Sequence, residues 1–422
     1  MKKTQVSKTR SGLRILSVPM SGTKTATILI LVATGSKYET RANNGISHFL
    51  EHMFFKGTEK RPTPMEISGE LDGLGAEYNA FTSKEYTGYW IKIDSSKLPA
   101  AVEVLSDLLL NSKFAQEEID RERGVVLEEI NMRLDNPIIY IDDLFEVLLY
   151  GDQPAGWEVI GTRENILKFQ RQDFIDYITS QYGSERMVVC LAGKFTPKSL
   201  ELVKKQFGGV KKAASSKAAK TREAQKVPQV MALYKATDQA HLSVGVRGIP
   251  EGHKDEFPLR VLSVLLGGSM SSRMFMELRE KRGLAYYVRT EAEFYDDSGY
   301  LTTTAGVPLD KIKDALRIIM TEYRKLLREP IRADELKKVK DLICGRVILQ
   351  LEASDDIANW YARHLLLENK IFSPEDFLKK IRAVRAEDLS RIAKQILVGK
   401  NLNLAIIGPY QDGEEFKELL NF

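Results

Sequence analysis

The chain has 422 residues, of which 43% are hydrophobic and 28% are charged, an ordinary balance for a globular protein with a sizeable core. This length exceeds that of a typical single domain, so two or more domains are expected. The formal net charge of +4 is too small for a chain of this length to indicate nucleic acid as a partner.

Three sequence features bear on the cellular location. The polar N-terminal residues are not followed by an apolar stretch, so no secretory signal is expected. No window approaches about 18 uninterrupted apolar residues, so we expect no membrane span and no membrane partner. Cys190 and Cys344 lie far apart and form no Cys-x-x-Cys pair, which favours buried free thiols and a cytoplasmic protein.

A β-rich run over residues 25–34, predicted to form one buried strand, precedes the most informative segment. Residues 44–57 read NGISHFLEHMFFKG, and the apolar run between the ends predicts a buried helix. His48 and His52 stand at positions i and i+4, so their imidazoles project from one face, roughly 6 Å apart along the axis. Two imidazoles at this spacing can share one zinc ion. Glu51 lies on nearly the same face, where its carboxylate can serve as a general base.

The alternative is that these three residues are unrelated polar side chains on an amphipathic helix. The chain has only five histidines, however, so this spacing with a glutamate between them is rare by chance. Three ionisable groups within an apolar run are also costly to bury unless they share a purpose. The pattern His-x-x-Glu-His is the inverse of the zincin motif and matches the inverzincin signature. A metal site is therefore the favoured hypothesis.

A catalytic zinc usually has three protein ligands, so a third ligand is expected on a nearby helix. Residues 116–131 are the best candidate segment, because they are strongly helical by propensity. Glu122 and Glu129 lie two turns apart on one stripe of this helix, with valines between them. An ordinary charged surface helix is the alternative. Spacing and propensity do not separate Glu128 from Glu129 as the ligand.

The middle of the chain is predicted to be a linker. Residues 210–226 contain no aromatic residue and almost no large apolar one, which is typical of a solvated, basic connection. A docking patch is the less favoured interpretation of this basic run. The linker predicts an N-terminal zinc-binding catalytic domain over residues 1–209. It also predicts a C-terminal domain over residues 227–422.

The two halves look like distant copies of one unit. Each begins with a β-rich run, continues with helices and closes with an apolar strand that ends in glycine, Gly193 in the first half and Gly408 in the second. Strands come first, helices follow and strands return. This order predicts an α+β fold with two similar domains, each a mostly antiparallel sheet with helices packed on one face.

Residues 48–52 (HFLEH) and 121–129 (RERGVVLEE) resemble the pitrilysin (insulinase) family of zinc metallopeptidases. The likeness covers essentially the whole chain. It is closest to the half-length members, which include the β-subunit of mitochondrial processing peptidase and its bacterial relatives. The resemblance implies two α+β domains that face each other across a chamber.

The resemblance also implies a role for each candidate residue of the metal site. The zinc ligands would be His48, His52 and Glu129, with Glu51 as the catalytic general base and Glu122 as a supporting acidic residue. Residues 71–82 resemble the family's edge strand, to which a substrate adds as a further strand. The substrate-binding residues there would be Asn79, Ala80 and Thr82. A plain hairpin strand is the alternative for this segment.

In the second half, residues 278–287 match a family arginine and tyrosine, here Arg279 and Tyr286. In relatives these residues reach across the chamber to the substrate and to the developing oxyanion, where a cation and a phenol stabilise negative charge. Without the resemblance, this segment would be interpreted as a helix end with solvated charges.

Together these observations predict a zinc-dependent endopeptidase, with Zn²⁺ as cofactor, that hydrolyses short or unfolded peptides. One alternative is a non-catalytic subunit of a processing-peptidase-like complex, and another is an active subunit that needs a different partner chain. The ligands, the base and the Arg/Tyr pair all stand in one chain, which favours a complete enzyme and a homodimer. The sequence gives no cleavage preference.

Overall fold

The computed structural model describes residues 4–213 and 217–422, which fall into two compact units, each built around one sheet. The first unit comprises the chain up to Ile130, then Trp157–Ala219 and Ile348–Ser373. The second comprises Asn131–Gly156, Lys220–Val347 and Pro374–Phe422. Each half of the chain therefore contributes one segment to the unit that the other half mainly builds.

The predicted domain boundaries treat each half as contiguous. The division between Ala219 and Lys220 falls inside the predicted linker 210–226, of which residues 214–216 lie outside the described residues. The compact units differ from the predicted domains over 1–209 and 227–422 in two segments: Asn131–Gly156 belongs to the second unit, and Ile348–Ser373 belongs to the first. The assignment of catalytic and substrate roles to these domains stays a prediction.

Six strands form the sheet of the first unit: β1 (Gln5–Lys8), β2 (Arg14–Pro19), β3 (Thr25–Val32), β4 (Glu77–Thr82), β5 (Thr87–Asp94) and β6 (Met187–Gly193). Their spatial order is β1–β2–β6–β3–β5–β4. Neighbouring strands are antiparallel, except that β2 and β6 are parallel. Among the described residues β4 pairs only with β5, so β4 is an edge strand.

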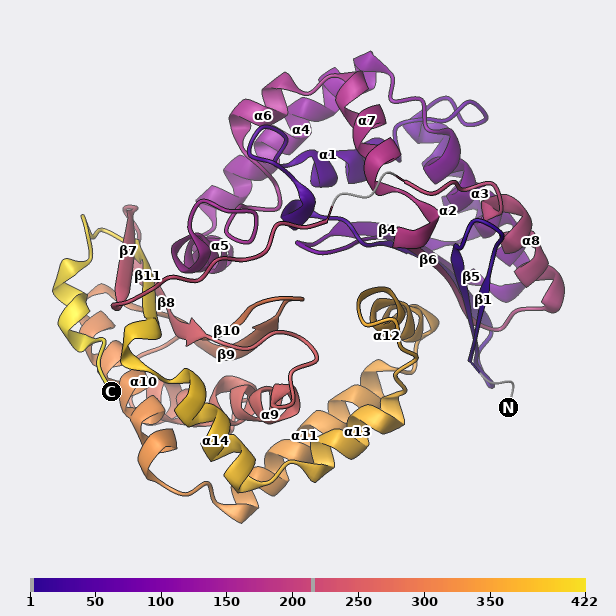
Figure 1. Ribbon diagram of the computed structural model, residues 1–422. Coiled ribbons are helices and arrows are strands. Elements are labelled where there is room, and N and C mark those ends of the chain that lie inside the picture. The colour runs from indigo at the N-terminus through magenta and orange to yellow at the C-terminus, as the bar shows by residue number, and fades with distance from the viewer. Residues whose placement is uncertain (1–3, 214–216) are drawn as a thin grey trace. The chain divides into compact units, whose positions relative to one another are not determined.

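The helices of the first unit cover both faces of this sheet. They are α1 (Ile46–Met53), α2 (Pro64–Leu74), α3 (Leu98–Asn111), α4 (Gln116–Asp135, which runs on into the second unit), α6 (Arg163–Lys168), α7 (Arg171–Gln181), α8 (Pro197–Phe207) and α12 (Ser354–Leu367). Because strand residues alternate between faces, Ile28 and Ile30 of β3 pack in the core shared with α1, α3, α7 and α8. Leu29 and Leu31 point the other way, and α12 covers them (Figure 1).

The second unit repeats this arrangement with five strands: β7 (Gln229–Tyr234), β8 (Gln239–Arg247), β9 (Tyr287–Phe294), β10 (Gly299–Pro308) and β11 (Leu402–Gly408). Their order is β7–β11–β8–β10–β9, in which only the neighbours β7 and β11 are parallel. The strands that end in Gly193 and Gly408, β6 and β11, hold equivalent places. The predicted repeat is therefore confirmed.

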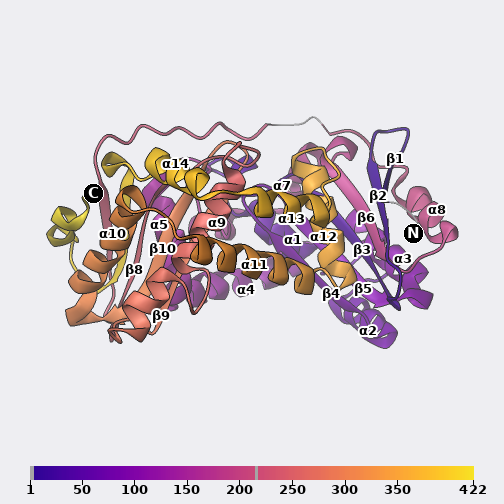
Figure 2. The same ribbon diagram turned by 90° about the horizontal axis from the view of Figure 1, so that it is seen from below.

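The helices of the second unit also form two layers. They are α5 (Pro137–Tyr150), α9 (Glu256–Gly267), α10 (Ile312–Arg328), α11 (Ala333–Gln350, which ends in the first unit), α13 (Pro374–Ala383) and α14 (Ala386–Ile396). Leu404 and Ile406 of β11 pack in the larger core with α9, α10 and α14, whereas Ala405 and Ile407 pack against α5. Figures 1 and 2 show α11 and α13 side by side.

Short helical turns join these elements. They are η1 (Ser36–Tyr38), η2 (Ser95–Lys97), η3 (Ser184–Arg186), η5 (Leu309–Lys311), η6 (Gly399–Asn401) and η7 (Glu414–Leu419), together with one π-helical turn, η4 (Phe275–Glu280). Cys190 and Cys344 are buried free thiols, as predicted. None of the helices in the described ranges combines the length and the apolar composition needed to cross a bilayer.

The predicted fold class is confirmed: two similar α+β units, each with a mostly antiparallel sheet. The structure adds one feature to the prediction of helices on one face. The second face of each sheet carries a helix as well, α12 in the first unit and α5 in the second. In both cases this helix comes from the segment that the other half of the chain contributes.

The packing of α12 predicts a position-specific loss of stability. Ala358 is fully buried against the sheet, so Ala358→Leu forces extra volume into a filled space. We expect the free energy of unfolding to fall by about 1–3 kcal/mol. Thermal or urea unfolding measures this, with Asn359→Leu on the exposed side of the same helix as the control. Equal unfolding curves for the two variants would contradict the close packing of α12.

Candidate metal centre

The helix α1 has one buried face and one half-buried face. Phe49, Leu50 and Met53 are buried in the core of the first unit. His48 and His52 lie on the other side and are partly accessible to solvent. The packed apolar side chains fix the rotation of α1 about its axis, so the two imidazoles face the same way.

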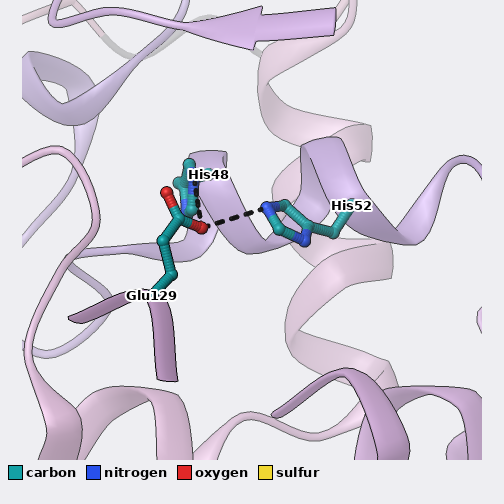
Figure 3. A group of neighbouring side chains, drawn as sticks. All are labelled: His48, His52 and Glu129. Carbon is teal, nitrogen blue, oxygen red and sulfur yellow. Dashed lines mark ion pairs between the residues drawn. The ribbon is translucent and has the colours of Figure 1, made fainter. Parts of the chain in front are cut away.

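Glu129 of α4 meets both histidines of α1. Figure 3 shows the three side chains pointing toward one another, and one ligand atom from each lies within 4.8 Å of the others. Glu129 Oε2 is 3.6 Å from Nε2 of His48 and 3.6 Å from Nε2 of His52. Ligand atoms at about 2.0–2.2 Å from one tetrahedral zinc are roughly 3.4 Å apart. Two imidazoles and a carboxylate at these separations fit a zinc ion.

The structure shows which of Glu128 and Glu129 faces the histidines, a choice that the sequence spacing alone left open. Glu128 is exposed on α4, whereas Glu129 is half-buried and faces the histidines. Consecutive residues of a helix point about 100° apart, so only one of them can face α1.

Glu122, two turns earlier on α4, forms a hydrogen bond with Nδ1 of His52, the ring nitrogen that is not directed at Glu129. His52 Nδ1 lies 2.8 Å from Glu122 Oε1, a bond in which the ring N–H donates to the carboxylate. This tautomer leaves the lone pair of Nε2 directed toward Glu129. Glu122 Oε2 is 2.5 Å from Lys56 Nζ. Burial alone raises the pKa of Glu122, but the bonds from His52 and Lys56 outweigh it, so this pKa lies below its usual value.

Glu51 lies next to the metal ligands and is tied to the edge strand. Thr82 Oγ1, at the end of β4, donates to Glu51 Oε2 over 2.6 Å. Burial raises the pKa of Glu51 above its usual value, although the Thr82 hydrogen bond and the field of His52 act in the opposite direction. A carboxylate with a raised pKa is a better proton acceptor near neutral pH.

The free edge of β4 carries the predicted substrate-binding residues. Ser83 N donates to Tyr86 O at the turn that joins β4 to β5. Bonded and non-bonded pairs alternate along an antiparallel ladder, so the backbone of Asn79 bonds to β5, while that of Ala80 and Thr82 faces outward. Ala80 N–H accordingly donates to the Asn79 side chain, 2.9 Å away. Outward backbone groups can pair with an added strand.

Arg279 and Tyr286 belong to the second unit, where the structure brings them together. Arg279 lies in the π-helical turn η4, and its Nη1 donates to the Tyr286 carbonyl over 2.8 Å. The guanidinium lies 5.1 Å from the ring centroid of Phe275 and 5.8 Å from that of Tyr286. The Tyr286 side chain is largely exposed. The action of this pair at the metal centre stays a prediction.

The sequence analysis missed Glu39, which caps α1. Its side chain is buried, and its two oxygens accept hydrogen bonds from Gly45 N and Ser47 N, each 2.8 Å long, and from Asn44 Nδ2. The first N–H groups of a helix lack intrahelical partners, and Gly45 provides no side-chain cap. No local pattern reveals this role, because the carboxylate comes from outside the usual cap position. It also missed Lys56, for which the spacing of four from His52 was an available signal.

Comparisons with known proteins identify the family of this chain. A family profile described as "Insulinase (Peptidase family M16)" matches residues 14–162, and one described as "Peptidase M16 inactive domain" matches residues 168–343. A protein of Bacillus subtilis named uncharacterized zinc protease is 34% identical over 400 residues, which cover 95% of this chain and 97% of that protein. The chain belongs to the M16 (insulinase) peptidase family. A Streptomyces coelicolor protein, also named uncharacterized zinc protease, is 33% identical over 408 residues, covering 95% of this chain and 88% of that protein.

Two solved structures share the fold. A crystal structure described as a protease from Helicobacter pylori has a TM-score of 0.90 at 26% identity and covers 96% of this chain and 99% of its own. A structure from Pseudomonas fluorescens, described as a peptidase M16 inactive domain, has a TM-score of 0.89 at 18% identity, covering 97% and 99%. The M16 fold therefore extends over nearly the whole chain.

The capping of α1 predicts that Glu39→Gln is destabilising. The amide replaces one acceptor oxygen with an NH₂ group that faces a backbone donor, so a buried N–H loses its partner. We expect the free energy of unfolding to fall by about 1–3 kcal/mol, measured by urea denaturation. Glu59→Gln, at an exposed position just after α1, is the matched control. An unchanged midpoint for Glu39→Gln would contradict the capping role.

Proposed function

We propose that this chain is a zinc-dependent endopeptidase that hydrolyses short or unfolded peptides. The observation that carries the proposal is the convergence of His48, His52 and Glu129, with Glu51 beside them. Two imidazoles and one carboxylate form a catalytic type of zinc site, because three protein ligands leave a fourth position for water. Relatives named zinc protease support the same cofactor.

The residues around the metal divide the chemistry between them. Zinc, when bound, supplies Lewis acidity that polarises the scissile carbonyl and makes water more acidic. Glu51 takes the proton of the attacking water and passes it to the leaving amine. Thr82 holds one oxygen of Glu51, which leaves the other oxygen for proton transfer. Glu122 keeps His52 oriented toward the metal.

The edge strand β4 binds the substrate as an added strand. The outward backbone groups of Ala80 and Thr82 bond to the peptide backbone, and Asn79 adds an amide side chain at the same edge. Such bonds are largely blind to side-chain identity. They require an extended segment whose own backbone groups are free, which favours short or unfolded peptides. Because Thr82 also contacts Glu51, the added strand lies beside the base.

Arg279 and Tyr286 are the proposed oxyanion contacts. The support from the structure is local: the arginine is held against the carbonyl of the tyrosine, and the tyrosine side chain is exposed. A guanidinium and a phenol stabilise the charge that grows on the carbonyl oxygen in the transition state. The homodimer and the cytoplasmic location stay predictions.

The base assignment predicts the behaviour of Glu51→Gln. The amide cannot accept the proton of water, so kcat/KM should fall by about 10²–10⁴-fold, whereas zinc content should stay unchanged. Mass spectrometry of a mixed peptide library, with metal analysis of the same protein, measures both quantities. Glu128→Gln removes an exposed carboxylate and should leave both quantities unchanged. Near-normal turnover by Glu51→Gln would remove Glu51 from its role.

The ligand assignment predicts a different result for Glu129→Ala. Loss of a direct ligand should weaken zinc binding by more than the roughly 10–100-fold that supporting residues contribute. Peptide cleavage should be lost with it, as it should be when a chelator removes zinc from the wild-type protein. Chelator competition measures the affinity, again with Glu128→Gln as the control. Retention of zinc by Glu129→Ala would place the third ligand elsewhere.

A further inference from the structure

We propose that Lys56 is a positioning residue of the metal centre, which acts by holding Glu122 in the orientation that directs His52 toward the metal. The inference rests on the proposed zinc site. It concerns a residue that pairs with Glu122 rather than supplying a metal ligand, so that its effect passes through one carboxylate.

Both oxygens of Glu122 are engaged, each by a different partner. His52 Nδ1 lies 2.8 Å from Oε1, and Lys56 Nζ lies 2.5 Å from Oε2. The Glu122 side chain is only 5% exposed, and that of Lys56 is 24% exposed. The carboxylate is therefore almost fully buried, and the lysine that pairs with it is partly exposed.

The second bond matters because the terminal torsion of a glutamate is broad. The plane of the carboxyl group rotates at little cost about the last carbon–carbon bond. A single hydrogen bond to His52 allows many such orientations, and the ring can follow them. Bonds from two directions restrict the plane of the carboxylate, and with it the direction of the His52 lone pair on Nε2.

Charge supports the same conclusion. A buried carboxylate is costly unless a cation or several donors compensate it. Without Lys56, Oε2 loses the cation 2.5 Å away. The carboxylate then lowers its free energy by turning toward water. That rotation would weaken the bond on which the orientation of His52 depends.

This ion pair differs from an ordinary surface pair, and the chain offers one for comparison. Lys60 pairs with Glu103, and their side chains are 61% and 30% exposed. Glu103 also bonds to Arg61, and this network includes none of the metal ligands, so loss of Lys60 should leave the metal centre unaffected. Lys60 comes four residues after Lys56 in the sequence. Lys60→Met therefore removes the same chemical group from a nearby position.

The test is the zinc affinity of the full-length protein, freed of metal and titrated with zinc alone against a competing chelator. We expect Lys56→Met to weaken zinc binding about tenfold, near the lower end of the effect of supporting residues. Lys56→Arg keeps the cation and should restore the affinity to within about threefold of wild type. Lys60→Met should match wild type. Equal affinities for Lys56→Met and wild type would overturn the inference.

A double-mutant cycle tests the route through Glu122. If Lys56 acts only by holding this carboxylate, Lys56→Met should cost less than about twofold in a Glu122→Gln background. Full additivity of the two losses would overturn the proposed route. In the cobalt-substituted protein, Lys56→Met should also alter the visible absorption bands that report ligand geometry, which Lys60→Met should not alter. Identical cobalt spectra for Lys56→Met and wild type would count against a positioning role.

The same titration separates this inference from the proposed function. If the wild-type protein does not bind zinc, both the proposed function and the role of Lys56 are contradicted. A second outcome separates the two: the wild-type protein binds zinc, Glu129→Ala does not, and Lys56→Met binds zinc as tightly as wild type. In that case only the role of Lys56 is contradicted. Thermal unfolding of the metal-free variants controls for loss of the fold. Because Lys56 compensates a buried carboxylate, Lys56→Met should lower the midpoint but keep one cooperative transition, and zinc affinity is measured well below that midpoint.

Discussion

The burial of one face of α1 is the constraint on which the metal centre depends. Phe49, Leu50 and Met53 fill the core of the first unit, and their packing allows only one rotation of the helix. That rotation presents His48 and His52 to α4, where Glu129 completes the set. The chemistry of the site is therefore set by apolar contacts made on the opposite side of the helix.

Polar contacts then restrict what the apolar packing leaves free. Glu39 satisfies the N–H groups at the start of α1, Glu122 orients the ring of His52 near its end, and Thr82 holds Glu51 beside the edge strand. Each bond comes from a different element of the first unit. Sites held in this way by packed and hydrogen-bonded neighbours keep their geometry before a ligand arrives.

The sequence predicted the parts of the site that follow from local spacing. His48, Glu51 and His52 lie within one helix, whose period places them on one face. The choice of Glu129 over Glu128 needed the family resemblance, because propensity does not say which side of α4 meets α1. Glu39 escaped prediction since its contacts depend on a loop conformation. The exchange of α5 and α12 between the two halves was not predicted, because the apolar face of a helix does not show which of two sheets the helix will cover.

The exchange of α12 has a consequence for how the protein is made. The face of β3 formed by Leu29 and Leu31 stays bare until α12 can cover it, and α12 ends at Leu367. On the ribosome, the sheet that supports the histidine helix is synthesised early, but this face stays uncovered until residues 354–367 have been made. A nascent chain therefore cannot complete this unit until most of the residues of the second unit have been synthesised.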